Sequence, residues 1–600
     1  MTRSRAWRWA PDSACARSLA VDVPVGAFTF VLHSHLPWVR WAGRWPFGEE
    51  WLHQALLDVY LPLLDAIETL DEEGIAGGIT LGVTPVLLEQ LRDPHLIAAF
   101  DAYVEQRIAL SRGDLVPRRD AFDRERRIMA ERYLGALNQR RDRWRRHWGR
   151  DVVGALREYV RRGRIEVLTS AATHAYLPLL ATDSAIDAQL SVGIAATRRL
   201  LGVEPRGIWL PECAYRGAYA PAGVPGYRPG IDAWLAAHGL RYAFVDAHAV
   251  AGAYDGWGAW SASLAQGVPA AYAGVSASGA ADQEAAAEAT GESTLRPHRL
   301  PSGVAFFARD ARVSRRVWSR DEGYPGDGAY REFHKRDERS GNAYWRVTGP
   351  GVRLAEKQWY DPAAARERVH AHAAHFASLV TEVLTDFARG GGPPGIVAAP
   401  FDAELFGHWW FEGPRWLVEV LRNVHASGVI ALTTPSAYLA AHGAERIAAL
   451  CESSWGEGGD SRVWFNADVA WMWPIVHRAE RAMERVAGRA YASPRERALA
   501  EQAGRELLLL SSSDWPFLIT TGQARDYAVE RFRTHAARFD ALAAALEGAD
   551  GDSAAIAAAF HDDTLFPHLD PRLFQARPPR ALPAPRLPLA RPLISRIAVS

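Results

Sequence analysis

The chain has 600 residues, more than one hydrophobic core usually supports, so we expect one large enzyme-sized domain and at least one further domain. Its 69 basic and 70 acidic residues almost cancel, which excludes a bulk field that would attract nucleic acid or an anionic membrane. The three cysteines are too few and too scattered for a disulfide framework or a cysteine-based metal site, which suits a reducing cytoplasm. No stretch approaches the length of a membrane span, and acidic residues and prolines interrupt any signal-peptide core, so we expect a cytoplasmic protein.

Short β-rich runs alternate with helical stretches over most of the chain. In order they are AFTFVLHSH, GGITLGVT, RIEVLTS, GIWLPE, RYAFVD, GVAFFARD, GIVAAPFD and GVIALTTP, between residues 27 and 435. Strands that alternate with helices favour a parallel sheet, and seven or eight such units predict a barrel. Parallel barrels carry their chemistry at the carboxyl ends of the strands, so functional side chains are expected where these runs end.

Two long amphipathic patterns lie between the second and third runs. They exceed a simple crossover and predict a helical insertion at about 91–150 within a catalytic domain of residues 26–440. A further segment of that domain, about 247–303, is rich in small and polar residues and predicts a flexible loop.

The two ends of the chain differ from this central part. Residues 1–25 form an N-terminal extension ahead of the first strand. Strand signals fade after about residue 440, and helical periodicity predicts a C-terminal helical domain over 441–548. Residues 549–600 are expected to form a tail, which is Pro/Arg-rich at its end and resembles a polyproline-type extension.

Polar side chains stand at the predicted strand ends. They are His33, His35, Ser170, Glu212, Asp246, Arg309, Asp310 and Asp402. His33 and His35 are two apart in a strand and therefore share a face. This spacing suits two metal ligands, as in a metal-dependent polysaccharide deacetylase, but equally two imidazoles that hydrogen-bond a ligand, or one core and one exposed histidine.

Two carboxylates end apolar strands near tryptophans. Glu212 follows the strand GIWLP, and Asp402 ends GIVAAPF and precedes Glu404, His408 and two tryptophans. A single aspartate at a strand end is usually a helix cap or a turn former. Glycoside cleavage, however, needs two carboxyl groups, and aromatic faces offer platforms for sugar rings. The pair therefore predicts a glycoside-cleaving site.

Several longer motifs resemble one known family. HSHLP, WLPECAY, VWSRDEGYPGD and FDAELFGHWW look like sequence regions of glycoside hydrolase family 57. SSWGEGGDSRVWFNADVAWMW and SSDWPFLI are similar to the C-terminal region of the family's 1,4-α-glucan branching enzymes. The resemblance covers about residues 26–545. It implies an incomplete (β/α)7 barrel, an inserted helical subdomain, a C-terminal all-helical domain, and a retaining mechanism without metal or other cofactor.

The resemblance also implies roles for particular residues. Glu212 corresponds to the nucleophile and Asp402 to the general acid/base. The expected substrate-binding residues are the histidines His33, His35 and His174, the tryptophans Trp45, Trp318, Trp359, Trp455 and Trp464, and the polar residues Arg309 and Asp514. For each tryptophan alone, ordinary core packing is at least as good an interpretation.

One region departs from the family pattern. Branching enzymes carry a tyrosine over the active site on the loop after the fifth strand, and here that loop is enlarged and rich in Ala and Gly. Tyr254 and Tyr272 are both candidates for this lid residue. The sequence thus predicts an enzyme of glycogen or α-glucan synthesis that forms α-1,6 branches, with α-glucan as donor and acceptor. The close alternative is a family member that mainly hydrolyses α-1,4-glucan or acts as a 4-α-glucanotransferase.

Overall fold

The computed structural model describes residues 24–118, 122–219, 228–251, 293–319, 323–447 and 449–576. The two lid candidates, Tyr254 and Tyr272, lie outside these ranges, as do most of the predicted loop at 247–303 and the Pro/Arg-rich end of the chain.

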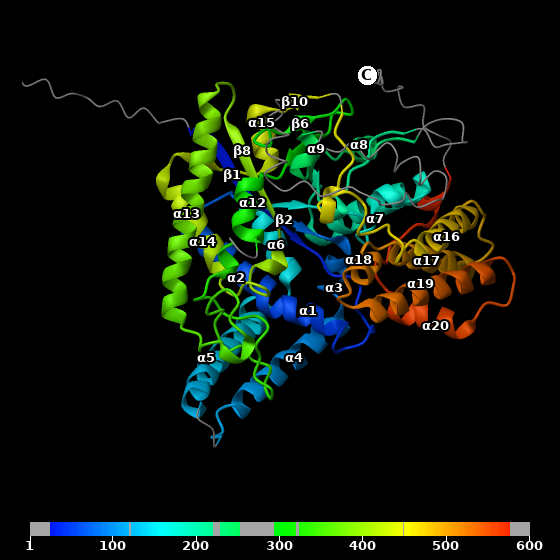
Figure 1. The fold of residues 1–600 in the computed structure, drawn as a ribbon. Helices are drawn as coiled ribbons and strands as arrows, with labels where there is room; N and C mark the ends of the chain where they lie inside the picture. Colours follow the sequence, from blue (N-terminus) through cyan, green and yellow to red (C-terminus); the bar gives the residue numbers. More distant parts are fainter. Residues whose placement is uncertain are drawn as a thin grey trace, which may run out of the picture.

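An open barrel of parallel strands forms the centre of the molecule (Figure 1). The hydrogen-bonded orders are β3-β2-β1-β8 and β7-β5-β4, and a parallel bridge between Thr169 and Ile208 joins β3 to β4. Within the described ranges no pairing connects β7 with β8, so the ring of seven strands is open there. The predicted incomplete seven-stranded barrel is confirmed. Its strands are β1 (Gly26–Ser34), β2 (Ile79–Val83), β3 (Glu166–Leu168), β4 (Gly207–Ile208), β5 (Tyr242–Val245), β7 (Ala305–Ala308) and β8 (Gly395–Asp402).

The last β-rich run does not add an eighth strand to the ring. It forms β9 (Ile430–Leu432), which pairs with residues 26–28 of β1, whereas β2 pairs with residues 30–34 of the same strand. β9 and β2 therefore share one edge of β1. Two further short strands, β6 (His298–Arg299) and β10 (Glu445–Arg446), extend the sheet that contains β7.

The barrel has an apolar interior and a covered exterior. Buried side chains from several strands fill the interior, including Val31, Leu168, Phe244, Phe307 and Ala398. The opposite faces of β1, β2 and β8 pack against helices. Every residue of β1 is buried because both of its faces are covered, which explains its almost unbroken run of apolar residues.

Helices of very different length connect the strands. α13 is the longest, with 28 residues, and it begins at an Asp361 side chain that accepts the Ala363 N–H. The helices around the barrel are α1 (Glu49–Ala55), continued by a π-helical turn (Leu56–Tyr60) and α2 (Leu61–Glu72), then α3 (Pro85–Gln90), α6 (Val152–Arg161), α7 (Asp183–Leu201), α8 (Ile231–Ala237), α9 (Ala247–Ala251), α12 (Ala311–Trp318), α13 (Pro362–Arg389), α14 (Gly413–Ser427) and α15 (Pro435–His442).

Two long helices form the insertion between β2 and β3. They are α4 (Pro94–Gly113) and α5 (Asp123–Asp142), as the amphipathic patterns predict. The segment before α13 packs on them, since Arg107 donates to the Ser340 carbonyl at 2.7 Å and Tyr344 donates to Asp114 at 2.7 Å.

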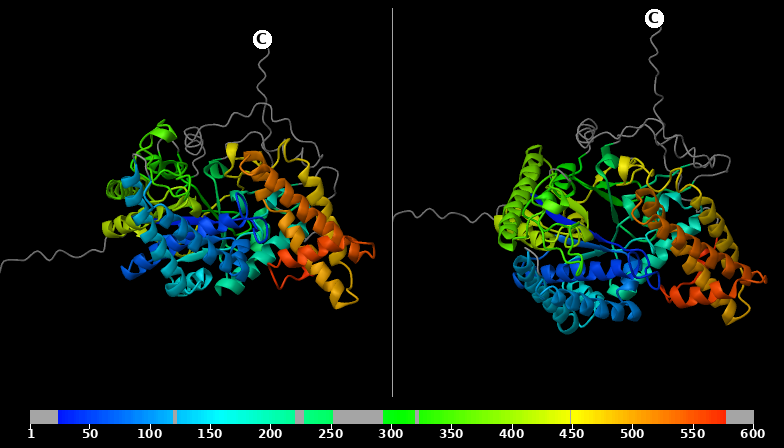
Figure 2. Two further views of the ribbon diagram at one scale, coloured as in Figure 1. Left: turned by 90° about the horizontal axis from the view of Figure 1, so that it is seen from below. Right: turned by 60° about the horizontal axis from the view of Figure 1, so that its bottom comes forward.

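The C-terminal helices pack on the other side of the barrel, opposite α13 (Figure 2). They are α16 (Met472–Ala487), α17 (Pro494–Leu510), α18 (Asp514–Thr521), α19 (Arg525–Leu546) and α20 (Ser553–Asp562). α17 ends at Leu510, residues 511–513 interrupt the helical structure, and α18 begins at Asp514.

Part of the predicted tail is folded. The structure continues past residue 549 with α20 and a short helical turn (Pro571–Phe574). Asp552 caps α20, and Leu565, Phe566 and Phe574 are buried. The alanine-rich stretch favours a helix, and the apolar residues behind it bury against the domain, so folded structure extends into the predicted tail.

Candidate active site

The strand pairing brings the first histidine motif next to the second carboxylate. In the register of β1 and β8, His33 lies opposite Asp402 at the carboxyl ends of both strands. Parallel strands end at one edge of the barrel, so both side chains belong to the functional face.

Glu212 is held in an unusual backbone conformation. β4 ends at Ile208, and Glu212 follows in a tight turn with φ 61°, where non-glycine residues cost about 1–3 kcal/mol. The backbone N–H of Trp455 donates to the Glu212 carbonyl at 3.0 Å and so secures the turn. The neighbouring Cys213 lies beyond the end of β4, and its thiol is buried in the barrel interior.

The Glu212 carboxylate accepts hydrogen bonds from the C-terminal part of the chain. Trp455 Nε1 donates to Oε2 at 3.1 Å, and the Ser513 hydroxyl donates to Oε1 at 3.1 Å. His174 Nδ1 lies 3.7 Å from Oε1. Burial, aided by the negative charge of Asp514 and opposed by the Trp455 hydrogen bond, raises the pKa of Glu212 to about 7.

Asp402 lies among negative charges instead of donors. Burial, together with the charges of Glu404 and Glu212, raises the pKa of Asp402 well above its usual range, and only the Arg309 charge opposes the rise. Arg309 itself is held by Asp246, to which its Nε donates at 3.1 Å. The surroundings of Asp402 therefore favour its protonated form, and no donor like Trp455 or Ser513 at Glu212 favours the carboxylate.

Three imidazoles are stacked beside the carboxylates. The rings of His35 and His174 are 3.9 Å apart, and His33 stacks on the Trp209 indole at 4.5 Å. His33 Nε2 and His174 Nε2 are 3.1 Å apart and hydrogen-bond to each other. His35 Nδ1 and the Thr84 hydroxyl are 3.0 Å apart. These nitrogens bond to one another and to side-chain oxygens, which fixes the orientation of the three rings.

The C-terminal helices contribute directly to the site through the start of α18. Asp514 accepts from His35 Nε2 at 3.0 Å, and Ser513 contacts both Glu212 and His174 Nδ1, the latter at 2.9 Å. Burial lowers the pKa of His35, but the Asp514 charge and hydrogen bond outweigh it and leave that pKa raised. Asp514 and the histidine motif thus meet, although they are far apart in sequence.

Only some of the predicted tryptophans lie at the carboxylates. Trp455 contacts Glu212, and the Trp318 ring lies 6.4 Å from the Trp455 ring and is 39 % exposed. Trp464 is 1 % exposed and stacks on Tyr176 at 4.7 Å, so it has no face open to a sugar.

The other two tryptophans lie elsewhere. Trp359 stacks on Trp345 at 5.3 Å, in the segment that packs against α5. Trp45 is 75 % exposed and lines a separate cavity, which does not include Glu212 or Asp402. Stacking of these residues at the cleaved bond is not supported by their positions.

Sequence reasoning missed several residues of the site. Tyr60 donates to Glu404 at 2.5 Å, and this partly buried glutamate raises the pKa of Asp402. The position of Glu404 two residues after Asp402 is a signal that the sequence offers. Nothing in the sequence links Tyr60 to it, because the partners are 344 residues apart.

One group of side chains in the described part of the chain has the geometry of a metal site: Glu506, His535 and Asp563, all buried in the C-terminal helices. Arg531 Nη2 lies 3.0 Å from His535 Nε2, and because a guanidinium can only donate, Nε2 accepts and the proton resides on Nδ1. That proton is donated to Glu506 at 2.8 Å, and Arg538 pairs with Asp563 at 2.5 Å. These ligand positions are already occupied by protons and arginines, so the residues do not fit a cation.

The site has two partly buried carboxyl groups in unlike surroundings. They lie on the carboxyl edge of a β/α barrel, beside aromatic rings and imidazoles, and together they define a glycoside-cleaving class of site. Comparison with known proteins agrees. The family model described as glycosyl hydrolase family 57 matches residues 29–450, and a model described as 1,4-alpha-glucan branching enzyme, C-terminal, matches residues 475–574. The chain belongs to glycosyl hydrolase family 57.

Named relatives align with most of the chain. A 1,4-alpha-glucan branching enzyme from Thermococcus kodakarensis is 42 % identical over 527 residues, which is 86 % of this chain and 73 % of the relative. A probable 1,4-alpha-glucan branching enzyme from Mycobacterium tuberculosis is 35 % identical over 560 residues, 89 % of this chain and 95 % of the relative.

Solved structures agree in the fold. A branching enzyme of this family from Pyrococcus horikoshii superposes with a TM-score of 0.81 at 39 % identity, covering 93 % of this chain and 98 % of that one. The α-amylase AmyC from Thermotoga maritima gives 0.74 at 29 % identity, covering 92 % and 99 %. Among the described residues, no helix is both long and apolar enough to cross a bilayer.

Proposed function

We propose that the chain is a 1,4-α-glucan branching enzyme that cleaves α-1,4 links and rejoins the released chain through an α-1,6 link, in glycogen or related α-glucan synthesis. The observation that carries this proposal is the origin of Ser513 and Asp514. Both belong to the region that matches the C-terminal model of branching enzymes, and both contact the site through Glu212 and His35. The similarity to named branching enzymes supports the same activity.

The first chemical step assigns unlike roles to the two carboxyl groups. Glu212 accepts two hydrogen bonds that favour its ionised form, so it is the nucleophile that attacks the anomeric carbon. Asp402, whose pKa the neighbouring carboxylates raise, donates its proton to the leaving glycosidic oxygen. The α-1,4 link breaks, the shorter glucan leaves with a new hydroxyl, and a glycosyl ester forms on Glu212.

The second step reverses these roles. The Asp402 carboxylate removes the proton from a 6-hydroxyl of the acceptor glucan, whose oxygen attacks the anomeric carbon and displaces Glu212. Two inversions retain the α configuration. Water in place of the acceptor would give hydrolysis, so the branching yield depends on the exclusion of water from the glycosyl ester.

Side chains around the pair bind and orient the glucan in this proposal. The stacked histidines and Asp514 hydrogen-bond sugar hydroxyls, and Trp318 and Trp455 present ring faces or edges to the sugar. Asp246 holds Arg309 in place, and the Arg309 charge lowers the pKa of Asp402. This charge stabilises the Asp402 carboxylate that acts as the base in the second step.

A rival activity also has an observation in its favour. The similar structure from Thermotoga maritima is named as an α-amylase, so a site of this overall design is compatible with net hydrolysis of α-1,4-glucan. Incubation of the enzyme with amylose, followed by isoamylase debranching and chain-length profiling, separates the two. Branching predicts new chains that isoamylase releases, with few reducing ends before debranching. Hydrolysis predicts reducing ends alone, and Glu212→Gln, which lacks the proposed nucleophile, is the control for contaminating activity.

A further inference from the structure

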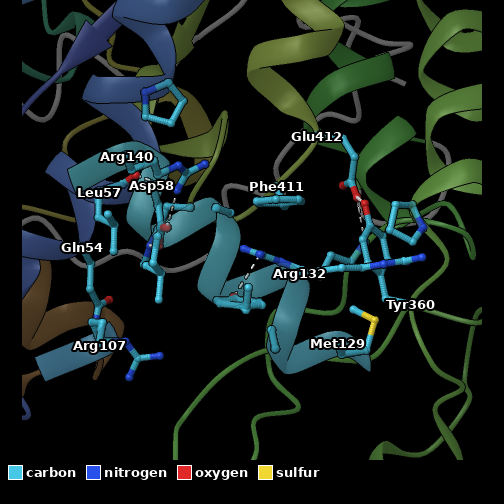
Figure 3. Close-up of a pocket in the computed structure, with 18 of the residues that line it drawn as sticks. Gln54, Leu57, Asp58, Arg107, Met129, Arg132, Arg140, Tyr360, Phe411 and Glu412 are labelled. Atoms are coloured by element: carbon cyan, nitrogen blue, oxygen red, sulfur yellow. Dashed lines mark hydrogen bonds and ion pairs between the residues drawn. The ribbon is translucent and has the colours of Figure 1, made fainter. Parts of the chain in front are cut away.

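A large cavity lies between the inserted helices, the π-helical turn after α1 and the segments on either side of α13 (Figure 3). Its volume is about 1050 Å³. Neither Glu212 nor Asp402 lines it, although His408, which follows Asp402 in the chain, forms part of its wall. We call it the arginine cavity after its lining arginines: Arg107, Arg132, Arg140, Arg331, Arg336, Arg366 and Arg415.

The carboxylates of the arginine cavity do not balance its arginines. Four carboxyl groups stand against seven guanidinium groups. Asp58 already balances nearby positive charge. Burial raises its pKa, but the His408 hydrogen bond and the charges of Arg140 and Arg331 outweigh burial and lower that pKa to about 2. Glu412 is also engaged: it accepts from the Tyr360 hydroxyl at 2.6 Å, and burial raises its pKa against the effect of that hydrogen bond. In Figure 3 Asp58 lies beside Arg140, and Glu412 lies at the opposite end beside Tyr360.

Two of the lining arginines are held in place by neutral groups. Arg107 donates to the Ser340 carbonyl and to the Asn342 side chain at 2.6 Å. Arg336 donates to the Phe333 carbonyl at 2.8 Å. No carboxylate in the described part of the chain forms an ion pair with either guanidinium. Their orientation is therefore fixed without neutralisation of their charge.

Arg331, whose charge also acts on Asp58, is oriented by neutral groups as well. Arg331 donates to the Tyr133 hydroxyl at 3.0 Å and lies 3.4 Å above the Phe411 ring. Burial and the charges of Arg331 and Arg107 lower the pKa of Arg336. Like charges thus face one shared space, an arrangement that a bound anion would stabilise.

We propose that the arginine cavity binds a sugar-sized ligand that carries a phosphate group. A guanidinium matches phosphate oxygens with paired donors, and preoriented arginines lose little entropy on binding. A neutral glucan needs acceptors as well as donors for its hydroxyl groups, whereas this cavity has a surplus of donors. The phosphate could come from a free sugar phosphate or from a phosphorylated glucose unit of a glucan, and both present the same group to the arginines.

Titration calorimetry with glucose 6-phosphate tests the proposal, with glucose as the uncharged probe at constant ionic strength. Arg132 and Arg366 are exposed and have no recorded partner among the described residues, so the double variant Arg132→Gln/Arg366→Gln should fold normally. Each charge-assisted hydrogen bond is worth about 1.5–3 kcal/mol, so the double variant should bind glucose 6-phosphate about tenfold or more weakly. Arg495→Gln, an exposed position on α17, is the matched control and should bind like the wild type.

Two further measurements complete the test. Sodium chloride should weaken the binding of glucose 6-phosphate, because its phosphate is recognised by charge. A phosphorylated maltoheptaose that binds more tightly than glucose 6-phosphate would assign the phosphate to a glucan chain, and equal binding would assign it to a free sugar phosphate. Absence of glucose 6-phosphate binding, equal binding of glucose, or unchanged binding in both the double variant and Arg336→Gln would overturn the proposal. None of these outcomes bears on the roles of Glu212 and Asp402.

Discussion

The two carboxyl groups differ in what surrounds each of them. Glu212 receives an indole N–H and a hydroxyl, whereas no hydrogen-bond donor to the Asp402 carboxyl is recorded among the described residues. Donors stabilise a carboxylate, and neighbouring carboxylates stabilise the protonated acid. The division into nucleophile and acid therefore follows from local contacts at single residues.

Replacement of Asp402 by Asn removes the proposed proton donor and keeps the shape of the side chain. The turnover of amylose should fall by about 10²–10⁴-fold, the usual contribution of general acid/base catalysis. An aryl glycoside with a good leaving group needs little protonation, so its first step should be partly restored in Asp402→Asn but not in Glu212→Gln. Burst kinetics with such a substrate measure this step. An equal loss on both substrates would contradict the acid/base role.

Glu404 is expected to set the pH range in which Asp402 holds its proton. Its negative charge raises the pKa of Asp402, so Glu404→Gln should lower that pKa. The acid then loses its proton at lower pH, and the alkaline limb of the kcat/KM profile should move to lower pH. The acid limb, assigned to Glu212 with its pKa of about 7, should move less.

The matched control for this change is Glu530→Gln, which removes an exposed carboxylate on α19. Its pH profile should equal that of the wild type. An alkaline limb that stays in place in Glu404→Gln, or shifts equally in Glu530→Gln, would mean that Glu404 does not control the proton on Asp402.

The sequence predicts the chemistry-bearing residues better than it predicts their neighbours. Trp455 and Trp464 belong to one motif, yet one indole donates to Glu212 and the other is buried against Tyr176. Spacing along an irregular segment does not reveal which side each ring occupies. Likewise, the Tyr60 contact with Glu404 depends on how β1, β8 and the π-helical turn come together.

At the scale of elements, alternation of strands and helices is sufficient to predict the barrel. It does not reveal that β9 pairs with residues 26–28 of β1 instead of closing the ring, because an apolar run of this length has the same pattern in either position. The folded part of the predicted tail also could not be predicted from the sequence. Its alanines favour a helix, but tertiary contacts decide whether that helix is stable.

The C-terminal helices are joined by a buried polar network. Asp563 is fully buried and pairs with Arg538, while Glu506 accepts from His535. Burial and the Asp563 charge raise the pKa of Glu506 well above its usual range, so this side chain favours the neutral form. The two acids therefore contribute to stability in unequal ways.

Loss of Asp563 should destabilise the protein much more than neutralisation of Glu506. Asp563→Ala leaves the largely buried Arg538 without one of its partners and should cost about 3–5 kcal/mol. Glu506→Gln retains an acceptor for His535 and should cost about 1 kcal/mol. Calorimetric melting measures both variants, and a chelator should leave the wild-type Tm unchanged. Equal losses, or a chelator-sensitive Tm, would contradict this account of the network.

At the scale of the whole molecule, the barrel and the C-terminal helices share one hydrophobic core. A single buried cluster contains Ala171 and Ile208 near β3 and β4 as well as Leu508 and Leu542 of α17 and α19. Backbone contacts reinforce it, since Ser513 N donates to the His174 carbonyl at 3.0 Å. The active site therefore lies at the interface between the barrel and the C-terminal helices, and both contribute residues to it.

A cavity made at this interface should reduce the stability of the barrel and the C-terminal helices together. Leu508 is 1 % exposed, and its carbonyl accepts from Thr173 of the segment after β3, so Leu508→Ala should cost about 2–5 kcal/mol. Because the core is shared, we expect one cooperative unfolding transition, with loss of amylose branching and loss of helical circular dichroism at the same temperature. Leu354→Ala, at a position that is 50 % exposed, should leave the Tm nearly unchanged. Two separate transitions in Leu508→Ala, with activity lost in only one of them, would mean that the barrel holds its catalytic geometry without the C-terminal helices, and the roles assigned to Ser513 and Asp514 would then be wrong.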